Sequence, residues 1–419
     1  MRVRLSPLSQ RLVGSSILKI AAEVRELTAS GAPVCDLTVG DFARAEFAVP
    51  ERLSRGVAEH VTHGQTNYPP ANGVLALRKA VAAHYKRSLD LDYPLDGIFV
   101  ASGGRPVIYA LYRTVVDSGE RVVFPVPSWN NDAYCNIMGA APVAVPCGPE
   151  TNFLPTAELL RPHLRGASLL VLNSPSNPAG TMFDAQQLGD ICDLVLRENA
   201  RRGEGERPLY VMYDQIYWML TFGQPHVNPV GLRPGMAQYT VFADGISKGF
   251  AATGLRVGWG VGPSDVIRSM ADLLTHLGAW APRPEQMATA ELLGDEPAMA
   301  EYRTRMIHDI RERLDLLAGG LEELRQAGLP VGSSAPQGAI YLSAHFDVQG
   351  RRTPDGTVLR TNEEIRRYLL QSCGMAVVPF QAFGQPDENG WFRLSVGAVS
   401  PRAIRDLIPR LRQALESLT

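Results

Sequence analysis

The stretch Phe242-Ala243-Asp244-Gly245-Ile246-Ser247-Lys248-Gly249 joins an apolar strand pattern to a glycine-containing loop that carries a lysine. The other lysines in the 419 residues are Lys19, Lys79 and Lys86. A lysine in a partly desolvated pocket loses part of its preference for the charged form, so its amine can attack an aldehyde and form a Schiff base. Because a Ser-Lys pair alone is usually just a solvated lysine, other segments must support this chemistry.

Segments on both sides of Lys248 provide that support. Arg256 follows it by eight residues, and Asn177 follows an apolar strand pattern upstream. A further strand pattern delivers Asp214 and, three residues later, Tyr217. A pyridoxal ring needs a partner for its pyridinium nitrogen and hydrogen-bond donors for its phenolate oxygen. Taken singly, Asn177 could belong to a turn and Tyr217 to the core, but in this order the residues predict a site for pyridoxal phosphate (PLP).

Over nearly its whole length, from about residue 37 to 399, the chain resembles the fold type I, class I/II aminotransferases, the aspartate aminotransferase superfamily. The resemblance rests on Asn-x-Pro-x-Asn-Pro-x-Gly at 173–180 and Asp-x-x-Tyr at 214–217. A Ser-Lys pair with arginine eight residues later, at 247–256, completes it. It implies a PLP-dependent enzyme that moves an amino group between an amino acid and a 2-oxo acid by a ping-pong route, with Ser247 among the cofactor-binding residues.

The same resemblance implies the roles of the central residues. Lys248 would form the internal aldimine and shuttle a proton between Cα and C4′. Asp214 would pair with the pyridinium nitrogen, which makes the ring an electron sink. Asn177 and Tyr217 would hydrogen-bond the phenolate oxygen, and Arg256 would clamp the phosphate. The predicted catalytic residues are therefore Lys248, Asp214 and Tyr217.

A glycine pair upstream predicts where the phosphate binds. Gly103 and Gly104 lie between a strand pattern at 97–101 and a helix pattern that opens at Pro106. Glycines allow close approach of the backbone, and free N–H groups at a helix N-terminus attract phosphate. In the family this position is the phosphate cup. Arg105 follows it and is expected either to support the phosphate or to meet the distal carboxylate of a dicarboxylic substrate.

The resemblance also assigns residues farther from the lysine. Trp129 would stack on the cofactor ring, although a tryptophan at a strand end is more often a core residue. Tyr68 would reach the phosphate of a neighbouring subunit, which implies a homodimer with shared active sites. Arg393, in an alternating strand pattern, would grip the substrate α-carboxylate with Gly40 and Asn177 nearby.

Two positions depart from the family pattern. Gln215 stands where an acidic residue is usual, and we expect little effect because that side chain should be peripheral. The usual Gly-Glu-Pro-Asp-Phe run is shortened to Gly-Asp-Phe at 40–42. Because this segment borders the substrate pocket, substrate specificity does not transfer from well-known members.

Composition narrows the class of protein. An apolar content of 45% is ordinary for a globular protein, and a net charge of -2 gives no reason to expect nucleic acid or an anionic membrane as partner. No uninterrupted apolar run reaches membrane-spanning length, and no signal peptide is evident. An odd number of cysteines without a C-x-x-C pair argues against a disulfide framework or a metal site and favours the cytoplasm.

The pattern of elements predicts an α/β fold with two domains. Short apolar strands alternate with helix patterns from about Gly97 to Val261, which indicates a mostly parallel sheet flanked by helices. A long helical stretch after Arg283 should connect this domain to a smaller α+β domain. We expect an N-terminal arm and part of the small domain at 1–50, the large PLP-binding domain at 51–325, and the C-terminal small domain at 326–419.

Other functions are also compatible with this sequence. Decarboxylases, β-lyases and amino acid oxidases share the same scaffold, because fold does not fix reaction. A regulator that only senses the cofactor is a further alternative, but such proteins carry an additional DNA-binding domain. Here the family match already starts within about the first 40 residues, where little independent folding is possible. A PLP-dependent aminotransferase is therefore the favoured prediction.

Overall fold

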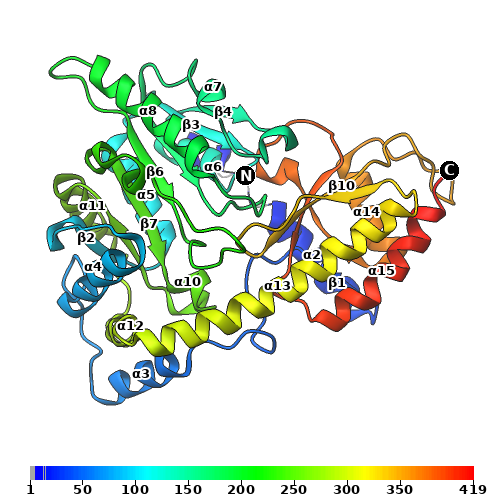
Figure 1. Ribbon diagram of the computed structural model, residues 1–419, viewed down its shortest axis with the longest axis horizontal. Coiled ribbons are helices and arrows are strands. Elements are labelled where there is room, and N and C mark those ends of the chain that lie inside the picture. The colour runs from blue at the N-terminus through cyan, green and yellow to red at the C-terminus, as the bar shows by residue number, and fades with distance from the viewer. Residues whose placement is uncertain (1–4, 13, 15) are drawn as a thin grey trace.

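The computed structural model describes residues 5–12, 14 and 16–419, and a seven-stranded sheet lies in its larger part (Figure 1). In spatial order the strands are β2 (Ile98–Ala101), β8 (Gly258–Val261), β7 (Thr240–Gly245), β6 (Tyr210–Asp214), β5 (Ala167–Asn173), β3 (Arg121–Val126) and β4 (Ala141–Pro146). All neighbours are parallel except β8, which is antiparallel to β2 and β7. The mostly parallel sheet predicted from the sequence is confirmed.

Both faces of this sheet are buried, which explains why its strands are continuously apolar. Successive side chains of a strand point to opposite faces. Val122 and Leu169 accordingly belong to one core cluster, whereas Val123 and Leu170 belong to the other. The first cluster is covered by α5 (Gly104–Val115), α6 (Asn131–Met138) and α11 (Ser264–Leu277), and the second by α4 (Leu75–Leu89), α8 (Ala185–Arg201) and α12 (Arg283–Gly294). Such double coverage is typical of parallel sheets.

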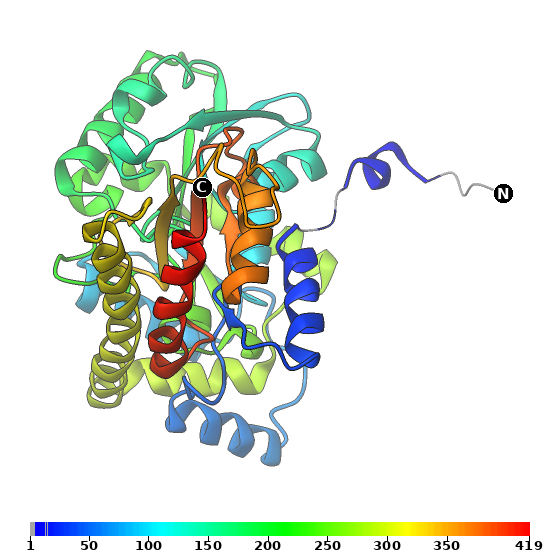
Figure 2. The same cartoon turned by 90° about the vertical axis from the view of Figure 1, so that its right-hand side faces the viewer.

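A smaller sheet lies at the other end of the molecule (Figure 1). Its order is β12 (Val378–Pro379), β13 (Trp391–Ser395), β10 (Tyr341–Phe346) and β9 (Val331–Ser333), all antiparallel, with α14 (Asn362–Cys373) and α15 (Pro401–Glu416) nearby. The N-terminal segment returns to this part, because β1 (Cys35–Asp36) pairs with β11 (Met375–Ala376). In Figure 2, α2 (Ser16–Ala29) also lies beside α14, and Glu23 of α2 forms an ion pair with Arg366.

The long helix α13 (Glu296–Gln326) runs from the large sheet towards α15 (Figure 1). The long helical stretch expected after Arg283 is confirmed as α13, which a shorter helix, α12, precedes; the chain breaks between them at Asp295. The Asp295 side chain accepts a hydrogen bond from the N–H of Ala298 and so caps α13.

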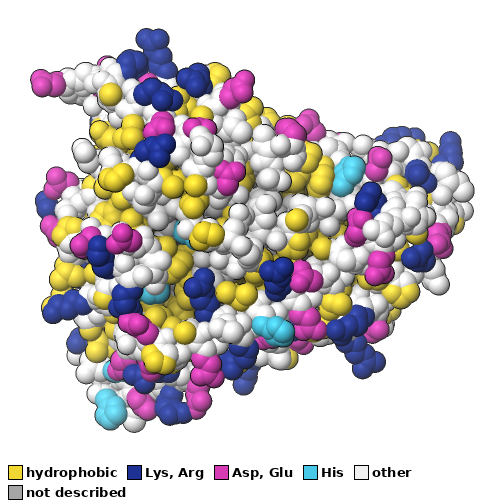
Figure 3. Space-filling model, in the orientation of Figure 1, with side chains coloured by type: hydrophobic (Ala, Val, Ile, Leu, Met, Phe, Trp, Pro, Cys, Tyr) yellow, Lys and Arg dark blue, Asp and Glu magenta, His cyan; other side chains and the backbone are white. Residues whose placement is uncertain are grey.

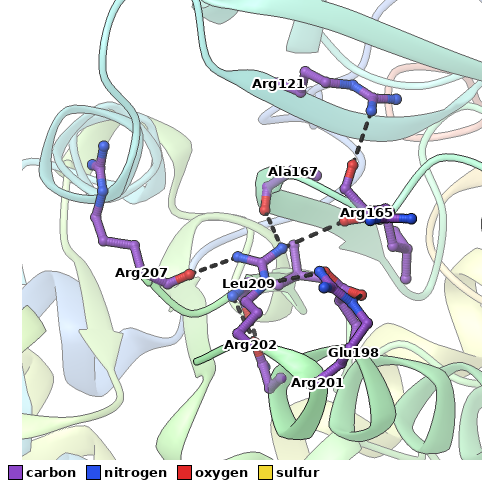
Figure 4. Close-up of polar contacts among 10 residues, drawn as sticks. Arg121, Arg165, Ala167, Glu198, Arg201, Arg202, Arg207 and Leu209 are labelled. Atoms are coloured by element: carbon purple, nitrogen blue, oxygen red, sulfur yellow. Dashed lines mark hydrogen bonds and ion pairs between the residues drawn. The ribbon is translucent and has the colours of Figure 1, made fainter. Parts of the chain in front are cut away.

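The polar loop at 201–206 is anchored by a buried arginine (Figure 4). Arg202 donates hydrogen bonds to the carbonyls of Ala167 at 2.7 Å and Arg207 at 2.6 Å. It also pairs with Glu198, and its side chain is only 8% exposed. Arg202 therefore ties α8 to the amino end of β5.

The remaining elements are short or peripheral. They are α1 (Pro7–Arg11), α3 (Glu51–Thr62), α7 (Ala157–Leu160), α9 (Pro229–Leu232), α10 (Ile246–Gly249) and the 3₁₀ turns at Leu95–Gly97, Pro149–Thr151, Pro234–Gln238, Thr253–Leu255 and Phe380–Phe383. Within the described residues no helix is long and apolar enough to cross a bilayer, and no group of acidic, histidine and cysteine side chains could hold a metal. Figure 3 shows basic and acidic side chains interspersed over one face.

Candidate active site

A cavity of about 610 Å³ lies where the large sheet meets the segments of the small one. Ligands bind outside the carboxyl ends of strands in open parallel sheets. β5 and β6 end at this cavity with Asn173 and Asp214, and Asp244, the penultimate residue of β7, also lines it. The predicted site residues that line it are Gly40, Gly104, Arg105, Trp129, Asn177, Asp214, Tyr217, Ser247, Lys248, Arg256 and Arg393. Two predicted residues do not line it: Gly103, which lies directly beside it, and Tyr68.

Lys248 reaches the cavity from α10, the short helix that follows β7. Its amine donates a hydrogen bond to the carbonyl of Gly40. The Nζ atom also lies 5.8 Å from the ring centroids of both Phe42 and Tyr217. Burial lowers the pKa of Lys248 to about 8, against the opposing effect of the Asp41 charge. An amine with this pKa can become neutral near physiological pH, as nucleophilic attack on an aldehyde requires.

Asp214 presents a carboxylate at the end of β6. Its Oδ1 accepts a hydrogen bond from the backbone N–H of Ile216 at 3.1 Å. Burial raises the pKa of Asp214 to about 6, while the N–H of Ile216 and the charge of Lys248 act in the opposite direction. A buried carboxyl of this kind gains most from a cationic ligand group, so it fits a protonated ring nitrogen.

Tyr217 and Asn177 are held by neighbours that the motifs did not assign to the site. The hydroxyls of Tyr217 and Tyr341 lie 2.6 Å apart, and burial raises the pKa of Tyr217 well above its ordinary value. Asn173 Oδ1 accepts from the N–H of Asn177 at 2.7 Å, and its Nδ2 donates to the carbonyl of Asp214 at 2.8 Å. Asn173 thus joins the ends of β5 and β6.

Arg393 comes from β13 and is fully buried. It donates to Asn177 Oδ1 at 3.1 Å and to the carbonyl of Thr38 at 2.6 Å, both uncharged acceptors. Its guanidinium lies 4.8 Å from the ring centroids of Tyr341 and Phe383, and its Nε has no hydrogen-bond partner among the described residues. A buried cation with neutral partners is costly unless an anion joins it, so this side chain fits a ligand carboxylate.

The cavity also offers donors for a second anion, at the N-terminus of α5. Gly103 caps the N-terminus of α5 with a φ of 90°, a conformation that glycine adopts without strain. A Cβ at Gly103 would approach Arg256 Nη2 to 2.3 Å, so glycine lets the guanidinium occupy its present position. Arg256 donates to the carbonyls of Thr253 at 2.6 Å and Ser102 at 3.1 Å. The helix N-terminus and Arg256 together fit a phosphate group.

Arg105 and Trp129 lie together at this cavity. The Cζ of Arg105 lies 5.2 Å from the ring centroid of Trp129, within the range of a cation-π contact. Tyr68, by contrast, is 82% exposed and packs edge-on against Trp280 at 5.3 Å. Its position outside the cavity of its own chain agrees with a contact to a neighbouring subunit, which stays a prediction.

Sequence reasoning gave no role to several residues at the site. Tyr341 and Asp41 line the cavity, and Asp41 accepts a hydrogen bond from Thr253 at 2.7 Å. In the sequence, Asp41 stands out only as part of the shortened 40–42 run. The expectation that Gln215 is peripheral is wrong, because this side chain is fully buried and donates to the Tyr85 hydroxyl at 3.2 Å. No sequence signal marked Tyr341.

Fold and cavity together define a PLP-type transferase of fold type I. The chain belongs to the aminotransferase class I and II family, whose model matches residues 32–411. The aspartate aminotransferase of Rhizobium meliloti (strain 1021) is 29% identical over 97% of this chain and 94% of its own length. A crystal structure of the Rhizobium meliloti enzyme covers both chains fully with a TM-score of 0.91 and 27% identity. The Thermus thermophilus aspartate aminotransferase with maleate has a TM-score of 0.86 and 26% identity over 99% of this chain and 100% of its own.

Family membership settles the class of enzyme. Members of the aminotransferase class I and II family use PLP, and the chain is an aminotransferase by this membership. The cavity agrees with that cofactor on independent grounds, because an amine, a carboxyl and a phosphate-type anion site face one space.

Proposed function

We propose that this enzyme transfers an amino group between an acidic amino acid and a 2-oxo acid by a ping-pong route with PLP. The observation that carries the proposal is the buried amine of Lys248 in one cavity with Asp214 and Arg393. When bound, PLP withdraws electrons from the Cα of the amino acid. The chain itself must hold the cofactor, orient the amino acid and move one proton.

The residues that would hold the cofactor divide by the group they meet. Lys248 would bond to it through the amine, and Asp214 would stabilise a protonated ring nitrogen. Asn177 and Tyr217 would donate to the ring oxygen. Gly103, Gly104, Ser247 and Arg256 would surround the phosphate, Trp129 would cover the ring, and Tyr68 of the partner subunit would reach the phosphate.

Lys248 is also the proposed base for the Cα proton. A general base works best when its pKa lies near the operating pH, and burial lowers the pKa of Lys248 to about 8. The carbonyl of Gly40 accepts from this amine, and Tyr217 lies against it. These contacts place the amine within the cavity that the substrate would enter.

Two arginines would orient the substrate. Arg393, with Asn177 and Gly40 beside it, would bind the α-carboxylate, because its Nε has no partner in the described part of the chain and its present acceptors are neutral. Arg105 would meet a second carboxylate from its position on Trp129. Relatives that are named aspartate aminotransferases, and the one solved with maleate, support a dicarboxylic substrate. We also propose a cytoplasmic homodimer with shared sites.

Half-reactions on the purified PLP-loaded enzyme test this function. An amino donor such as glutamate should change the bound-cofactor spectrum to that of pyridoxamine phosphate, and 2-oxoglutarate should reverse the change. Release of carbon dioxide or ammonia, or consumption of oxygen, would instead indicate a decarboxylase, a β-lyase or an oxidase. Borohydride should fix PLP to the peptide that contains Lys248, and Lys248→Ala should abolish turnover. Label on Lys79 or Lys86 would contradict the assignment.

A further inference from the structure

Asp244 is a buried carboxyl to which the proposed mechanism gives no role. It lies on β7 four residues before Lys248 and is 1% exposed. Its Oδ1 accepts from the N–H of Gly245 at 2.7 Å. Its Oδ2 accepts from the hydroxyl of Tyr85 at 3.0 Å and from Nε1 of Trp218 at 2.9 Å. All three donors are uncharged, so hydrogen bonds alone stabilise this group.

The Tyr85 hydroxyl extends this arrangement across the back of the site. It accepts hydrogen bonds from Gln215 Nε2 and Trp259 Nε1, each at 3.2 Å, while it donates to Asp244. A hydroxyl has one proton to donate and two lone pairs to accept, so these three hydrogen bonds use the full bonding capacity of the Tyr85 hydroxyl. Gln215 in turn contacts His226 Nε2 through Oε1 at 3.2 Å. With Gln215 donating through Nε2, the Tyr85 proton points to Asp244, which is the acceptor of that bond.

The network connects the backbone segments that carry the proposed catalytic residues. Gln215 directly follows Asp214, and Trp218 directly follows Tyr217. Gly245 is the N-cap of α10, the short helix that contains Lys248. These segments belong to different strands, and β6 and β7 pair only as far as Asp214 and Ala243. One further backbone hydrogen bond follows, from the N–H of Gln215 to the carbonyl of Ala243 at 3.1 Å, and the Asp244 network adds side-chain links between the two segments.

We propose that Asp244 is a positioning residue of the active site, which acts through Tyr85, Trp218 and Gly245 to fix the segments carrying Asp214, Tyr217 and Lys248. The inference rests on the proposed function for its catalytic consequence. The network itself belongs to the cofactor-free chain and is testable there.

An amide at position 244 would disturb the network in either orientation. With its oxygen towards Gly245, its NH₂ group would face the N–H of Trp218, which only donates. With the amide turned over, the NH₂ group would face the N–H of Gly245. Asp244→Asn therefore keeps the size of the side chain and places two donors against each other. The shape of the cavity lining is otherwise retained.

The matched experiment compares two tyrosines. Tyr85 and Tyr93 both pack edge-on against Phe242, with centroid distances of 6.2 Å and 6.3 Å. The Tyr93 hydroxyl is buried without a hydrogen-bond partner among the described residues, whereas that of Tyr85 joins the network. Tyr85→Phe thus removes the central hydroxyl, and Tyr93→Phe removes an unused one from a similar environment.

In the PLP-loaded enzyme we expect kcat to fall about 10- to 100-fold for Asp244→Asn and Tyr85→Phe, because the catalytic groups lose alignment. The KM for the amino donor should change less than about twofold, since Arg393 is untouched. The pH titration of the cofactor absorbance should also shift. Tyr93→Phe should match the wild type in all three. Wild-type kcat and an unshifted titration in Tyr85→Phe would overturn the proposal, even if Asp244→Asn fails to fold.

A second readout needs no cofactor or turnover. Trp218 and Trp259 both donate into the network, so near-ultraviolet circular dichroism of the cofactor-free protein should change in Tyr85→Phe but not in Tyr93→Phe. Equal spectra for wild type and Tyr85→Phe would count against the network. If the wild-type enzyme shows neither borohydride label at Lys248 nor transamination, the proposed function is wrong. The circular dichroism comparison still tests the hydrogen-bond network in that case.

Discussion

At the scale of the residue, the ionisable groups of the site are buried, and burial disfavours their charged forms. Burial lowers the pKa of Lys248 to about 8 and raises that of Asp214 to about 6. It also lowers the pKa of Arg393, whose hydrogen bonds reach only neutral acceptors. Perturbed groups of this kind cluster at functional sites because they are positioned for a ligand rather than for stability. Arg105 differs, since it is exposed and rests on Trp129.

Arg105 gives the substrate prediction. If its guanidinium reads a side-chain carboxylate, Arg105→Ala should weaken glutamate and aspartate half-reactions by about 1.5–3 kcal/mol, the scale of a charge-assisted hydrogen bond. Alanine and aromatic donors should be little affected, and PLP affinity should stay intact. Stopped-flow absorbance of each half-reaction measures these effects.

Arg113→Ala serves as the control for Arg105→Ala. Arg113 lies in the last turn of the same helix α5 and is not among the residues that line the cavity. Its replacement should leave all donors unchanged. Equal losses for acidic and neutral donors in Arg105→Ala would indicate that Arg105 supports the cofactor phosphate and does not bind a substrate carboxylate.

At the scale of the element, the carboxyl end of a strand holds residues of the site, whereas its amino end can be anchored to the rest of the fold. β5 ends at Asn173 in the cavity and begins at Ala167, whose carbonyl accepts from Arg202. The turn after β7 positions α10 and with it Lys248. A change at the amino end of β5 can therefore affect stability without contacting the site.

Arg202 gives the stability prediction. Arg202→Ala should lower the free energy of unfolding by about 2–4 kcal/mol, because the carbonyl of Ala167 loses its donor and Glu198 loses one of its two arginine partners. Arg201→Ala is the matched control: Arg201 pairs with the same Glu198 but is 46% exposed, so its loss should cost less than about 1 kcal/mol. Chemical denaturation measures both values. Similar values for the two variants would show that the buried carbonyl contacts contribute nothing, and a lower kcat in correctly folded Arg202→Ala would contradict the separation of anchor and site.

At the scale of the whole molecule, the cavity lies between two sheets and is lined by both. Tyr341 and Arg393 come from the small sheet, and Asp214 and Lys248 from the large sheet and the helix that follows it. We propose domain limits at about residues 50 and 325, supported by the pairing of β1 with β11 and by the passage of α13 between the two sheets. Relative movement of the two parts would change access to the cavity.

The exposed Tyr68 gives the prediction at this scale. If it reaches the phosphate of a second subunit, Tyr68 and Lys248 variants that are inactive alone should regain activity when mixed, because a mixed dimer contains one intact site. Activity should rise with subunit exchange, which labelled subunits can monitor. Exchange without recovered activity would show that each subunit has a self-contained site.

The sequence by itself determined the local arrangement of this protein. Apolar runs predicted the strands of the large sheet, since both faces are buried, and the motif residues follow directly after strand patterns. Asp214 and Lys248 could be proposed as site residues for that reason, because parallel strands end at one edge. The long helix predicted after Arg283 is α13, and the cap at Asp295 sets where it begins.

Only the tertiary structure decided which distant residues meet. Arg393 bonds to Asn177 across 216 positions, and Tyr85 bonds to Asp244 across 159. Tyr341 enters the site because the small sheet packs against the large one, which no local periodicity records. Such contacts depend on the packing of whole elements, and hydrogen-bond partners of buried groups are fixed only when every donor and acceptor is in place.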